Sequence, residues 1–385
     1  MSRTSAIYLD YNATAPVRPA VVAAVARALE TGGNPSSVHA VGRVARNMVE
    51  EAREKVAALI GASPGDVVFT SGGTEANNLC LRALQAKGYK LLVSAVEHPS
   101  VMETAMALGG AVIPVDQNGI VTPEALAATL DAQTTKGQPV LVSVMTANNE
   151  TGVIQPVQAL AATAHENGAL FHTDAVQAAG KISFDNNDIN ADLVTLSGHK
   201  AGAGAGVGAL VITPAVGKLT GIVTGGGQEK SLRPGTENLS GIVGFGVAAE
   251  LALAEVSDAG QVRHLRDDLE GRISKIAGDA VIFGSAADRV NNTCCVAMPG
   301  VDSEVQVMAF DLEGIAVSAG AACSSGKVSA SPVLLAMGVA QELAASAIRI
   351  SLGQGTTQSD IDGFVESWSG MYRRLGSRNK ELSAA

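Results

Sequence analysis

The sequence is poor in aromatic residues and in positive charge. Phe, Trp and Tyr make up 3% of the 385 residues, so Ala, Gly and Val carry much of the 46% apolar content. Small apolar residues of this kind favour tightly packed α/β layers over an all-β sandwich. The net charge of −10 argues against binding to nucleic acid or to a membrane surface, since both need clustered basic residues.

Cysteine is also scarce, and long apolar runs are missing. The four cysteines (Cys80, Cys294, Cys295 and Cys323) have neither a zinc-ligand spacing nor the framework of a secreted disulfide protein. No window approaches the roughly 18 apolar residues of a membrane span, and the first residues lack the apolar core of a signal peptide. We therefore expect a cytoplasmic protein in a reducing compartment.

Apolar runs of strand length alternate with helical stretches through the first two thirds of the chain. The predicted strands are 66–70, 90–95, 139–145, 169–175, 191–197 and 208–213. The predicted helices are 17–30, 40–60, 74–88, 99–108, 123–130 and 156–167. This alternation predicts a mostly parallel sheet with helices on both faces.

The pattern changes near residue 257, and the length suits about two domains. A long helical run over 238–278 leads into a shorter α+β portion, with strands expected near 280–283, 292–298, 315–318 and 347–352. We predict a large domain over 16–256. The small domain takes 1–15 and 257–385.

The segment SGGTEANN (71–78) follows a predicted strand and opens a helix. Its small residues let backbone N–H groups approach an anion at the helix N-terminus, and Thr74 adds a hydroxyl. A simple turn with an N-cap is the alternative, and a Gly-Gly turn alone does not decide between them.

The predicted strand 169–175 carries His172 and ends at a carboxylate, Asp174, with Gln177 just beyond. Burying a carboxylate is costly unless a cation pairs with it. A protonated pyridine nitrogen, as in pyridoxal phosphate (PLP), an arginine or a metal ion could be that cation.

The segment SGHK (197–200) follows the predicted strand 191–197. A desolvated lysine at this place suits Schiff-base formation, because burial lowers the pKa of its amine. A surface lysine on a loop is the commoner alternative for any single residue. The run AGAGAGVG (201–208) that follows Lys200 either leaves space for a bound group or is a flexible turn.

The segment SAGAACSSGK (318–327) places Cys323 among small residues. A thiol on such a loop has the access that reactivity requires, although a lone loop cysteine is more often inert. Cys294 and Cys295, within an apolar run, and Cys80, in a helical stretch, are predicted to be core residues.

Taken together, these segments resemble the cysteine desulfurases, the fold-type I PLP enzymes of nitrogen fixation and iron–sulfur cluster assembly within the class V aminotransferase family. The resemblance spans almost the whole chain. Its ordered motifs are YLDYNATAPV, GNPSSVHAVGR, TSGGTEANN, EHPSV, NNETGVIQP, FHTDAVQAAGK, SGHK, RPGTEN, SAGAACSSG and IRISLG. It implies a large domain with a mostly parallel seven-stranded sheet and a smaller α+β domain. The long form of the loop after Cys323 matches the first of the family's two groups.

The resemblance also implies roles for individual residues. Lys200 would carry the cofactor, Asp174 would pair with the pyridine nitrogen, Gln177 would contact the ring hydroxyl, and His98 would stack on the ring and assist proton transfer. Thr236 resembles a residue that reaches the phosphate of the neighbouring subunit, which implies a homodimer with shared sites. The implied cofactor-binding residues are Gly73, Thr74, Asn149, Asp174, Gln177, Ser197, His199, Lys200 and Thr236.

For the substrate, the resemblance implies that Arg349 clamps the carboxylate of L-cysteine and that Asn34 makes a further contact. Lys200, His98 and Cys323 would be catalytic, with Cys323 taking the substrate sulfur as a persulfide while L-alanine is released. The sulfur would serve iron–sulfur cluster assembly or another sulfur transfer, with a scaffold or other acceptor protein as partner. No metal is expected in the free enzyme, although Cys323 could ligate a cluster together with a scaffold.

Other functions stay open. A selenocysteine lyase or an aminotransferase-like relative would use the same cofactor, although transamination needs no thiol. A sulfur-relay or scaffold-binding protein on a catalytically silent PLP fold is the alternative of another class, and the complete set of Lys200, Asp174, His98 and Cys323 disfavours it. The family pattern usually has a proline and a basic residue shortly after the lysine, whereas AGAGAGVG has neither.

Overall fold

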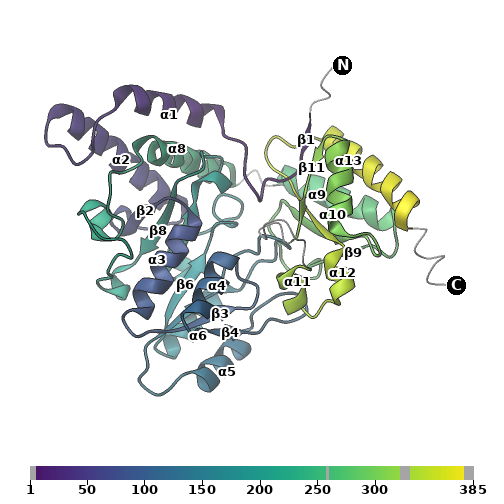
Figure 1. The fold of residues 1–385 in the computed structure, drawn as a ribbon, viewed down its shortest axis with the longest axis horizontal. Helices are drawn as coiled ribbons and strands as arrows, with labels where there is room; N and C mark the ends of the chain where they lie inside the picture. Colours follow the sequence, from purple (N-terminus) through teal and green to yellow (C-terminus); the bar gives the residue numbers. More distant parts are fainter. Residues whose placement is uncertain (1–5, 257–259, 321–329, 377–385) are drawn as a thin grey trace.

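The computed structural model describes residues 6–256, 260–320 and 330–376. Two groups of strands and helices lie side by side in Figure 1, one around a seven-stranded sheet and the other around a four-stranded sheet. We call these the large sheet and the small sheet. The architecture confirms the predicted α/β fold class with a mostly parallel seven-stranded sheet.

The large sheet has the strand order β2-β8-β7-β6-β5-β3-β4. Its strands are β2 (Val67–Thr70), β3 (Lys90–Ser94), β4 (Ala111–Ile113), β5 (Val140–Ser143), β6 (Leu170–Asp174), β7 (Leu193–Ser197) and β8 (Gly208–Ile212). Neighbours from β4 through β7 are parallel, whereas β8 runs antiparallel to both β7 and β2. All six predicted strands are present. The strand β4 was missed, because three residues are too short to show a period.

Six helices on the large sheet begin and end close to the predicted bounds. They are α1 (Pro19–Thr31), α2 (Ala40–Leu59), α3 (Gly73–Gln85), α4 (Pro99–Ala107), α5 (Pro123–Gln133) and α6 (Val157–Glu166). The short α7 (Asn186–Ile189) was not predicted, and α8 (Leu239–Glu255) is the first part of the predicted run over 238–278. Proline at the first position of α1, α4 and α5 suits these starts, because a helix leaves its first N–H groups without partners.

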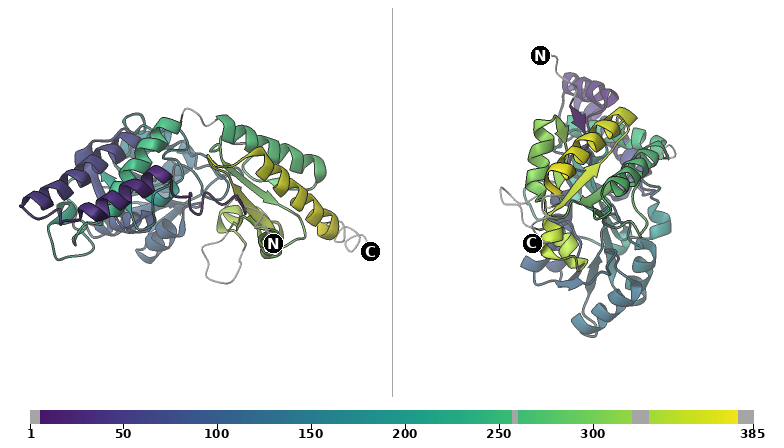
Figure 2. Two further views of the ribbon diagram at one scale, coloured as in Figure 1. Left: turned by 90° about the horizontal axis from the view of Figure 1, so that it is seen from above. Right: turned by 90° about the vertical axis from the view of Figure 1, so that its right-hand side faces the viewer.

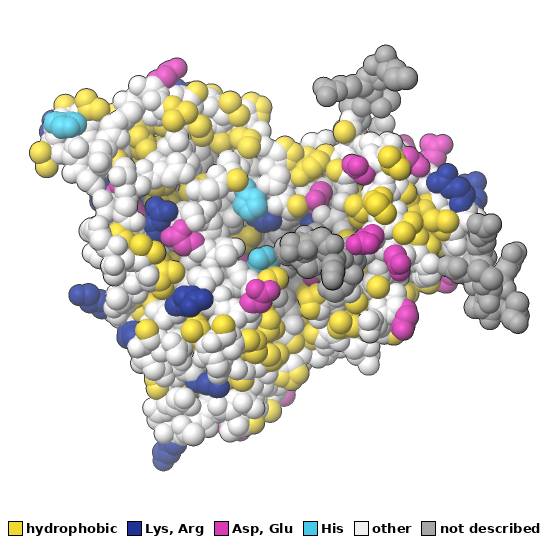
Figure 3. Space-filling view, viewed as in Figure 1, with side chains coloured by type: hydrophobic (Ala, Val, Ile, Leu, Met, Phe, Trp, Pro, Cys, Tyr) yellow, Lys and Arg dark blue, Asp and Glu magenta, His cyan; other side chains and the backbone are white. Residues whose placement is uncertain are grey.

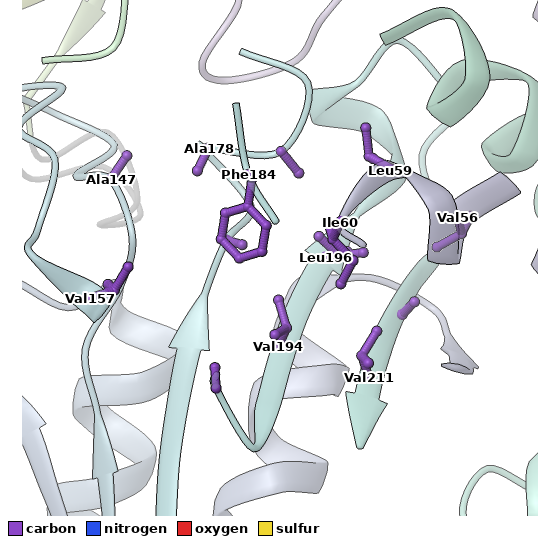
Figure 4. Close-up of a cluster of buried hydrophobic side chains, with 14 of the residues drawn as sticks. Val56, Leu59, Ile60, Ala147, Val157, Ala178, Phe184, Val194, Leu196 and Val211 are labelled. Carbon is purple, nitrogen blue, oxygen red and sulfur yellow. The ribbon is translucent and has the colours of Figure 1, made fainter. Parts of the chain in front are cut away.

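Alternation along the strands divides the core of the large sheet into two layers. Val67 and Phe69 pack into the cluster that contains α2 and α8, whereas Val68 packs on the other face with residues of α3 and α4. Figure 4 shows part of the first layer, where Phe184 and the end of α2 at Ile60 lie against Leu196 of β7. Helices thus cover both faces of the large sheet, and the polar side chains of the site lie at the ends of the strands.

The small sheet is antiparallel, with the order β12-β13-β10-β9. Its strands are β9 (Val281–Ile282), β10 (Thr293–Ala297), β12 (Ser318–Ala319) and β13 (Ala347–Ser351). Its helices are α9 (Gly260–Ile276), α10 (Ser303–Leu312), α11 (Pro332–Ala336), α12 (Gln341–Ala345) and α13 (Gln358–Met371). The helices α9 and α13 run along one side of this sheet (Figure 2).

Successive residues of β10 face opposite sides of the small sheet. Cys294 packs among α9, α10 and α13, whereas Cys295 packs with Val96 and Val333 on the side of the large sheet. The N-terminal strand β1 (Ile7–Tyr8) pairs in parallel with β11 (Ile315–Ala316). The segment that contains β1 therefore lies beside the small sheet, and the chain then enters α1.

The predicted helical run over 238–278 is in fact two helices, α8 and α9, which meet at an angle of 75°. Among the described residues, no single helix is long and apolar enough to cross a membrane, and only this bent pair reaches the required length and composition when both helices are counted together. On the face drawn in Figure 3, lysine and arginine side chains are scattered.

Candidate active site

A cavity of about 350 Å³ lies where the carboxyl ends of β6 and β7 meet the small sheet. Open α/β sheets bind their ligands at this edge. Ten of the residues predicted for the site line this one cavity: Gly73, Thr74, His98, Asn149, Asp174, Gln177, Ser197, His199, Lys200 and Arg349. Segments up to 276 residues apart in the chain are thereby brought together.

Asp174, the last residue of β6, presents a buried carboxylate to the cavity, with 6% of the residue exposed. The Asn77 side chain donates to Oδ2 over 2.8 Å, and the backbone N–H of Val176 donates to Oδ1 over 3.0 Å. Within the described residues no salt bridge involves this carboxylate. A buried anion with only neutral donors fits a ligand that brings its own positive charge.

Lys200 ends the short 3-10 helix η2 (Gly198–Lys200) directly after β7. Its Nζ donates to the backbone carbonyls of Asn12 and Ala13 over 2.6 and 2.7 Å. The N-terminal segment therefore forms one wall of the cavity and orients the amine. Sequence reasoning missed Asn12, because nothing in the local pattern of YLDYNAT links it to a lysine 188 positions later.

His98 caps the N-terminus of α4, and its Nδ1 accepts from the backbone N–H of Ser100 over 3.1 Å. The Ser100 hydroxyl lies 2.8 Å from the same nitrogen and accepts from Asn77, whose other amide hydrogen goes to Asp174. This accounting of donors assigns the neutral imidazole proton to Nε2. Burial lowers the pKa of His98, the charge of Asp174 opposes that shift and Lys200 adds to it. The ring is thus set to be neutral, with its proton on Nε2.

The N-terminus of α3 opens onto the cavity at Gly73 and Thr74, opposite Ser197 and His199. Nδ1 of His199 lies 2.8 Å from the Thr14 hydroxyl. Burial, assisted by the charge of Lys200, lowers the pKa of His199 to about 4, so it is neutral at pH 7. Backbone N–H groups and hydroxyls of this kind fit the phosphate of a bound cofactor.

Two glycines of the run after Lys200 allow close packing. A Cβ on Gly208 would lie 2.6 Å from the backbone carbon of Gly72, just before α3. Gly202 has a φ of +89°, and a Cβ there would lie 2.8 Å from Nε of Arg18. At these two positions the close approach of neighbouring atoms leaves no room for a side chain, a reason for glycine that neither predicted alternative gave.

Arg349 reaches the cavity from β13. Its neighbours Ile348 and Ile350 pack into the core beneath α9 and α13, so alternation turns Arg349 to the opposite face. Nη2 donates to Asp10 over 2.8 Å and Nη1 donates to the Asn149 carbonyl over 3.0 Å, while the buried Nε has no partner among the residues that the structure describes. Because these contacts use only some of the N–H groups of the guanidinium, others remain to donate to a carboxylate.

Three predicted residues are not placed in the cavity. Asn34 and Thr236 are exposed and do not line it, and the Asn34 side chain accepts from the backbone N–H of Ser36 over 2.9 Å. Cys323 lies outside the described residues.

The three described cysteines (Cys80, Cys294 and Cys295) are free thiols and are buried, and burial raises the pKa of each. Their predicted place in the core is confirmed. Within the described ranges, no group of three or more His, Cys, Asp or Glu side chains is placed to hold a metal ion.

Comparison with known proteins agrees with this geometry. The profile of the aminotransferase class-V family matches residues 7–364. A cysteine desulfurase IscS of Dictyoglomus turgidum is 41% identical over 367 residues, covering 92% of each chain. A cysteine desulfurase of Cereibacter sphaeroides is 43% identical over 371 residues, covering 94% of each. A NifS-like protein from Rickettsia africae superimposes with a TM-score of 0.89 at 36% identity, covering 96% of this chain and 99% of that chain.

The chain therefore belongs to the aminotransferase class-V family, in the branch of the cysteine desulfurases. The predicted family, enzyme class and PLP cofactor are confirmed. The residues of the cavity fit PLP, since a buried carboxylate, an oriented lysine amine and a helix N-terminus face the same space.

Proposed function

We propose that the protein removes sulfur from L-cysteine and passes it on through a persulfide on Cys323. One observation carries the proposal. Lys200, Asp174 and a neutral His98 face one cavity, and Arg349 enters the same cavity from the small sheet. This arrangement occurs in a chain that is 41–43% identical to cysteine desulfurases.

Each of these residues has a task in the proposal. Asp174 holds the ring nitrogen of PLP protonated, and Gln177 contacts the ring hydroxyl. The amine of Lys200 holds the cofactor and accepts the α-proton of the substrate, and His98 moves the proton of the substrate thiol. Arg349 binds the substrate carboxylate, whereas the predicted contact of Asn34 has no support from the cavity of its own chain. When bound, PLP stabilises the negative charge that develops at the α-carbon.

The sulfur step balances without an added oxidant. The thiolate of Cys323 attacks the substrate sulfur, so the carbon–sulfur bond breaks and a sulfur–sulfur bond forms. L-cysteine and one enzyme thiol give L-alanine and one enzyme persulfide. A reductant or an acceptor protein then takes the outer sulfur and restores the thiol.

We further propose a homodimer in which Thr236, together with Gly73, Thr74, Ser197 and His199, holds the cofactor phosphate across the subunit boundary. The exposed position of Thr236, outside the cavity of its own chain, supports this arrangement. An iron–sulfur scaffold is the proposed sulfur acceptor. The free thiols of the described cysteines fit a reducing compartment, and we propose the cytoplasm.

We also propose the domain division 16–256 against 1–15 with 257–385. It is supported by the strands of the large sheet, which all lie within 67–212, and by β1, which pairs with β11 beside the small sheet.

The test is the production of alanine and sulfide from L-cysteine in the presence of a reductant. The purified protein should show a visible absorbance band of lysine-bound PLP, and Lys200→Ala should lose it. Cys323→Ser should keep the band and lose sulfide production. If Cys323→Ser makes sulfide at the unsubstituted rate, the persulfide step is wrong.

A further inference from the structure

A second lysine, Lys181, lies close to Lys200 and has no part in the reaction described above. It stands four residues after Gln177, on the turn that follows β6. Its Nζ donates to Asn12 Oδ1 over 2.7 Å and also to Gln177 Oε1. The amine therefore points into the protein, toward the cofactor cavity, although the residue as a whole is only half-buried.

Asn12 connects the two lysines. It is 1% exposed, and its backbone carbonyl accepts from Lys200 over 2.6 Å and from Nε2 of Gln177 over 3.1 Å. Its side-chain oxygen accepts from Lys181. A closed ring of hydrogen bonds thus runs from Lys181 through Gln177 to Asn12 and back. Because Lys181 can only donate, it fixes the Gln177 amide with Nε2 turned toward the Asn12 carbonyl.

The charges around the two amines are mostly positive. The cofactor cavity also contains His98, Asp174, His199 and Arg349. A second cavity, of about 260 Å³, lies on the other side of Lys200, and its ionisable residues are Tyr11, Arg18, Lys181, Lys200 and Glu255. Arg18 and Glu255 neutralise each other at 2.7 Å. Arg349 is likewise paired with Asp10 at 2.8 Å, and burial keeps both histidines neutral. The amines of Lys181 and Lys200 therefore share one remaining carboxylate, Asp174.

The proton affinity of Lys181 reflects this environment. Burial lowers its pKa well below the ordinary value, and the charges of Lys200 and Arg349 lower it further. Repulsion between two titrating groups acts equally on both, so each amine makes it harder for the other to stay protonated.

We propose that Lys181 is a positioning residue for the cofactor lysine, which holds Asn12 and Gln177 in place and prevents Lys200 from retaining its proton. The proposal rests on the role of Lys200 proposed above, because an amine bonds to the PLP aldehyde only when it is unprotonated. Lys181 thus prepares the amine without contacting the cofactor.

The experiment measures PLP recombination with the full chain after the cofactor has been removed, as a function of pH and without cysteine. Lys181→Met removes both the charge and the hydrogen bonds, whereas Lys181→Gln removes the charge and keeps a donor. The matched control is Lys90→Met, since Lys90 lies at the start of β3 and its amine donates to the Gly109 carbonyl over 2.7 Å at the surface. Circular dichroism reports whether each variant is folded.

Both Lys181 variants should raise the pH midpoint of the recombination rate by about one unit, because a like charge close by is lost. Lys181→Met should also lower PLP affinity about tenfold through the loosened Asn12 and Gln177, and Lys181→Gln should lower it less. The inference is overturned if the midpoint of a folded Lys181→Gln or Lys181→Met protein equals that of Lys90→Met.

The two proposals fail separately. If the unsubstituted protein recombines with PLP but makes no sulfide from cysteine, the proposed function is wrong. The pH midpoints of the recombination rate then still test the role of Lys181. If sulfide is made and the midpoints do not move, only the role of Lys181 is wrong.

Discussion

Asp10 and Arg349 join the N-terminal segment to the small sheet at the rim of the cofactor cavity, with Asp10 Oδ1 and Arg349 Nη2 2.8 Å apart. The two residues are 339 positions apart in the chain. Asp10 thus fixes the guanidinium that we propose binds the substrate carboxylate.

We expect Arg349→Ala to raise the KM for L-cysteine by about 10- to 100-fold, as charge-assisted hydrogen bonds contribute roughly 1.5–3 kcal/mol. Asp10→Asn should raise it less, because the guanidinium remains but is oriented less firmly. Steady-state kinetics of sulfide production measure both. Asp362→Asn, in an exposed pair with Arg272 at 2.6 Å, is the control. An unchanged KM in Arg349→Ala would remove Arg349 from substrate binding.

Asn77 links Asp174 to Ser100 with the two hydrogens of its amide. Asn77→Ala should weaken PLP retention about tenfold, since the buried carboxylate loses one of its two donors. Equilibrium dialysis followed by the visible absorbance measures the retention. Asn78→Ala on the same helix is the control, because the Asn78 amide bonds to the Thr74 carbonyl and does not line the cavity. Equal retention in the two variants would contradict this role.

Glu150 should make the protein less stable as the pH rises. Burial raises its pKa to about 7, although the Ser331 hydroxyl at 2.5 Å and the charge of Arg349 act in the opposite direction. The folded state therefore holds this proton more tightly than the unfolded state. Its stabilising contribution is complete below about pH 4.5 and is lost as the pH rises through 7, in total about 3 kcal/mol.

Glu150→Gln keeps the bond to Ser331 and has no proton to lose. Denaturant unfolding at pH 5 and pH 8 should show the stability of the variant rising relative to the unsubstituted protein as the pH increases. The exposed Glu166→Gln is the control. Parallel pH profiles for Glu150→Gln and the unsubstituted protein would show that Glu150 is not held protonated.

His172 should make the folded protein less stable as the pH falls below about 6.5. It is fully buried in β6 between the hydroxyls of Ser143 and Thr195, and burial lowers its pKa to about 3. Below pH 6.5 the unfolded state binds a proton that the folded state does not, so stability falls with falling pH. At pH 4.5 this loss amounts to about 3 kcal/mol.

His172→Gln should not show this dependence between pH 6.5 and 4.5, although it will be less stable at neutral pH because the packing of β6 is disturbed. The slope of the unfolding free energy against pH separates the two effects. A variant slope equal to that of the unsubstituted protein would mean that other groups cause the acid sensitivity.

Much of the fold follows from local patterns. Each of the strands β2, β3, β5, β6, β7 and β8 is a short apolar run bounded by turn residues, and burial on both faces requires such a run. The division of the predicted run 238–278 into α8 and α9 was missed, although Ser257, Asp258 and Gly260 are residues typical of a helix boundary. The opposite directions of Cys294 and Cys295 follow from strand alternation once β10 is recognised.

The site was predictable in part. Asp174 lies at the end of a predicted strand and Lys200 follows another, and the chemistry of both can be inferred from the residue types. Asn12, Asn77 and Lys181 were missed. Asn77 and Asn12 matter through contacts with residues 97 and 188 positions away, which no local pattern reveals. For Lys181, the sequence does not tell whether the amine is buried or exposed.

The sequence by itself determined the order of the elements and the identity of the groups at the strand ends, since both depend on interactions between near neighbours. The tertiary structure alone decided that the carbonyl of Asn12 accepts from the amine of Lys200 and that Arg349 pairs with Asp10 at the rim of the cavity. Those contacts join segments that only the packing of the two sheets brings together, and burial in that packing sets the pKa values of His98, His199 and Lys181.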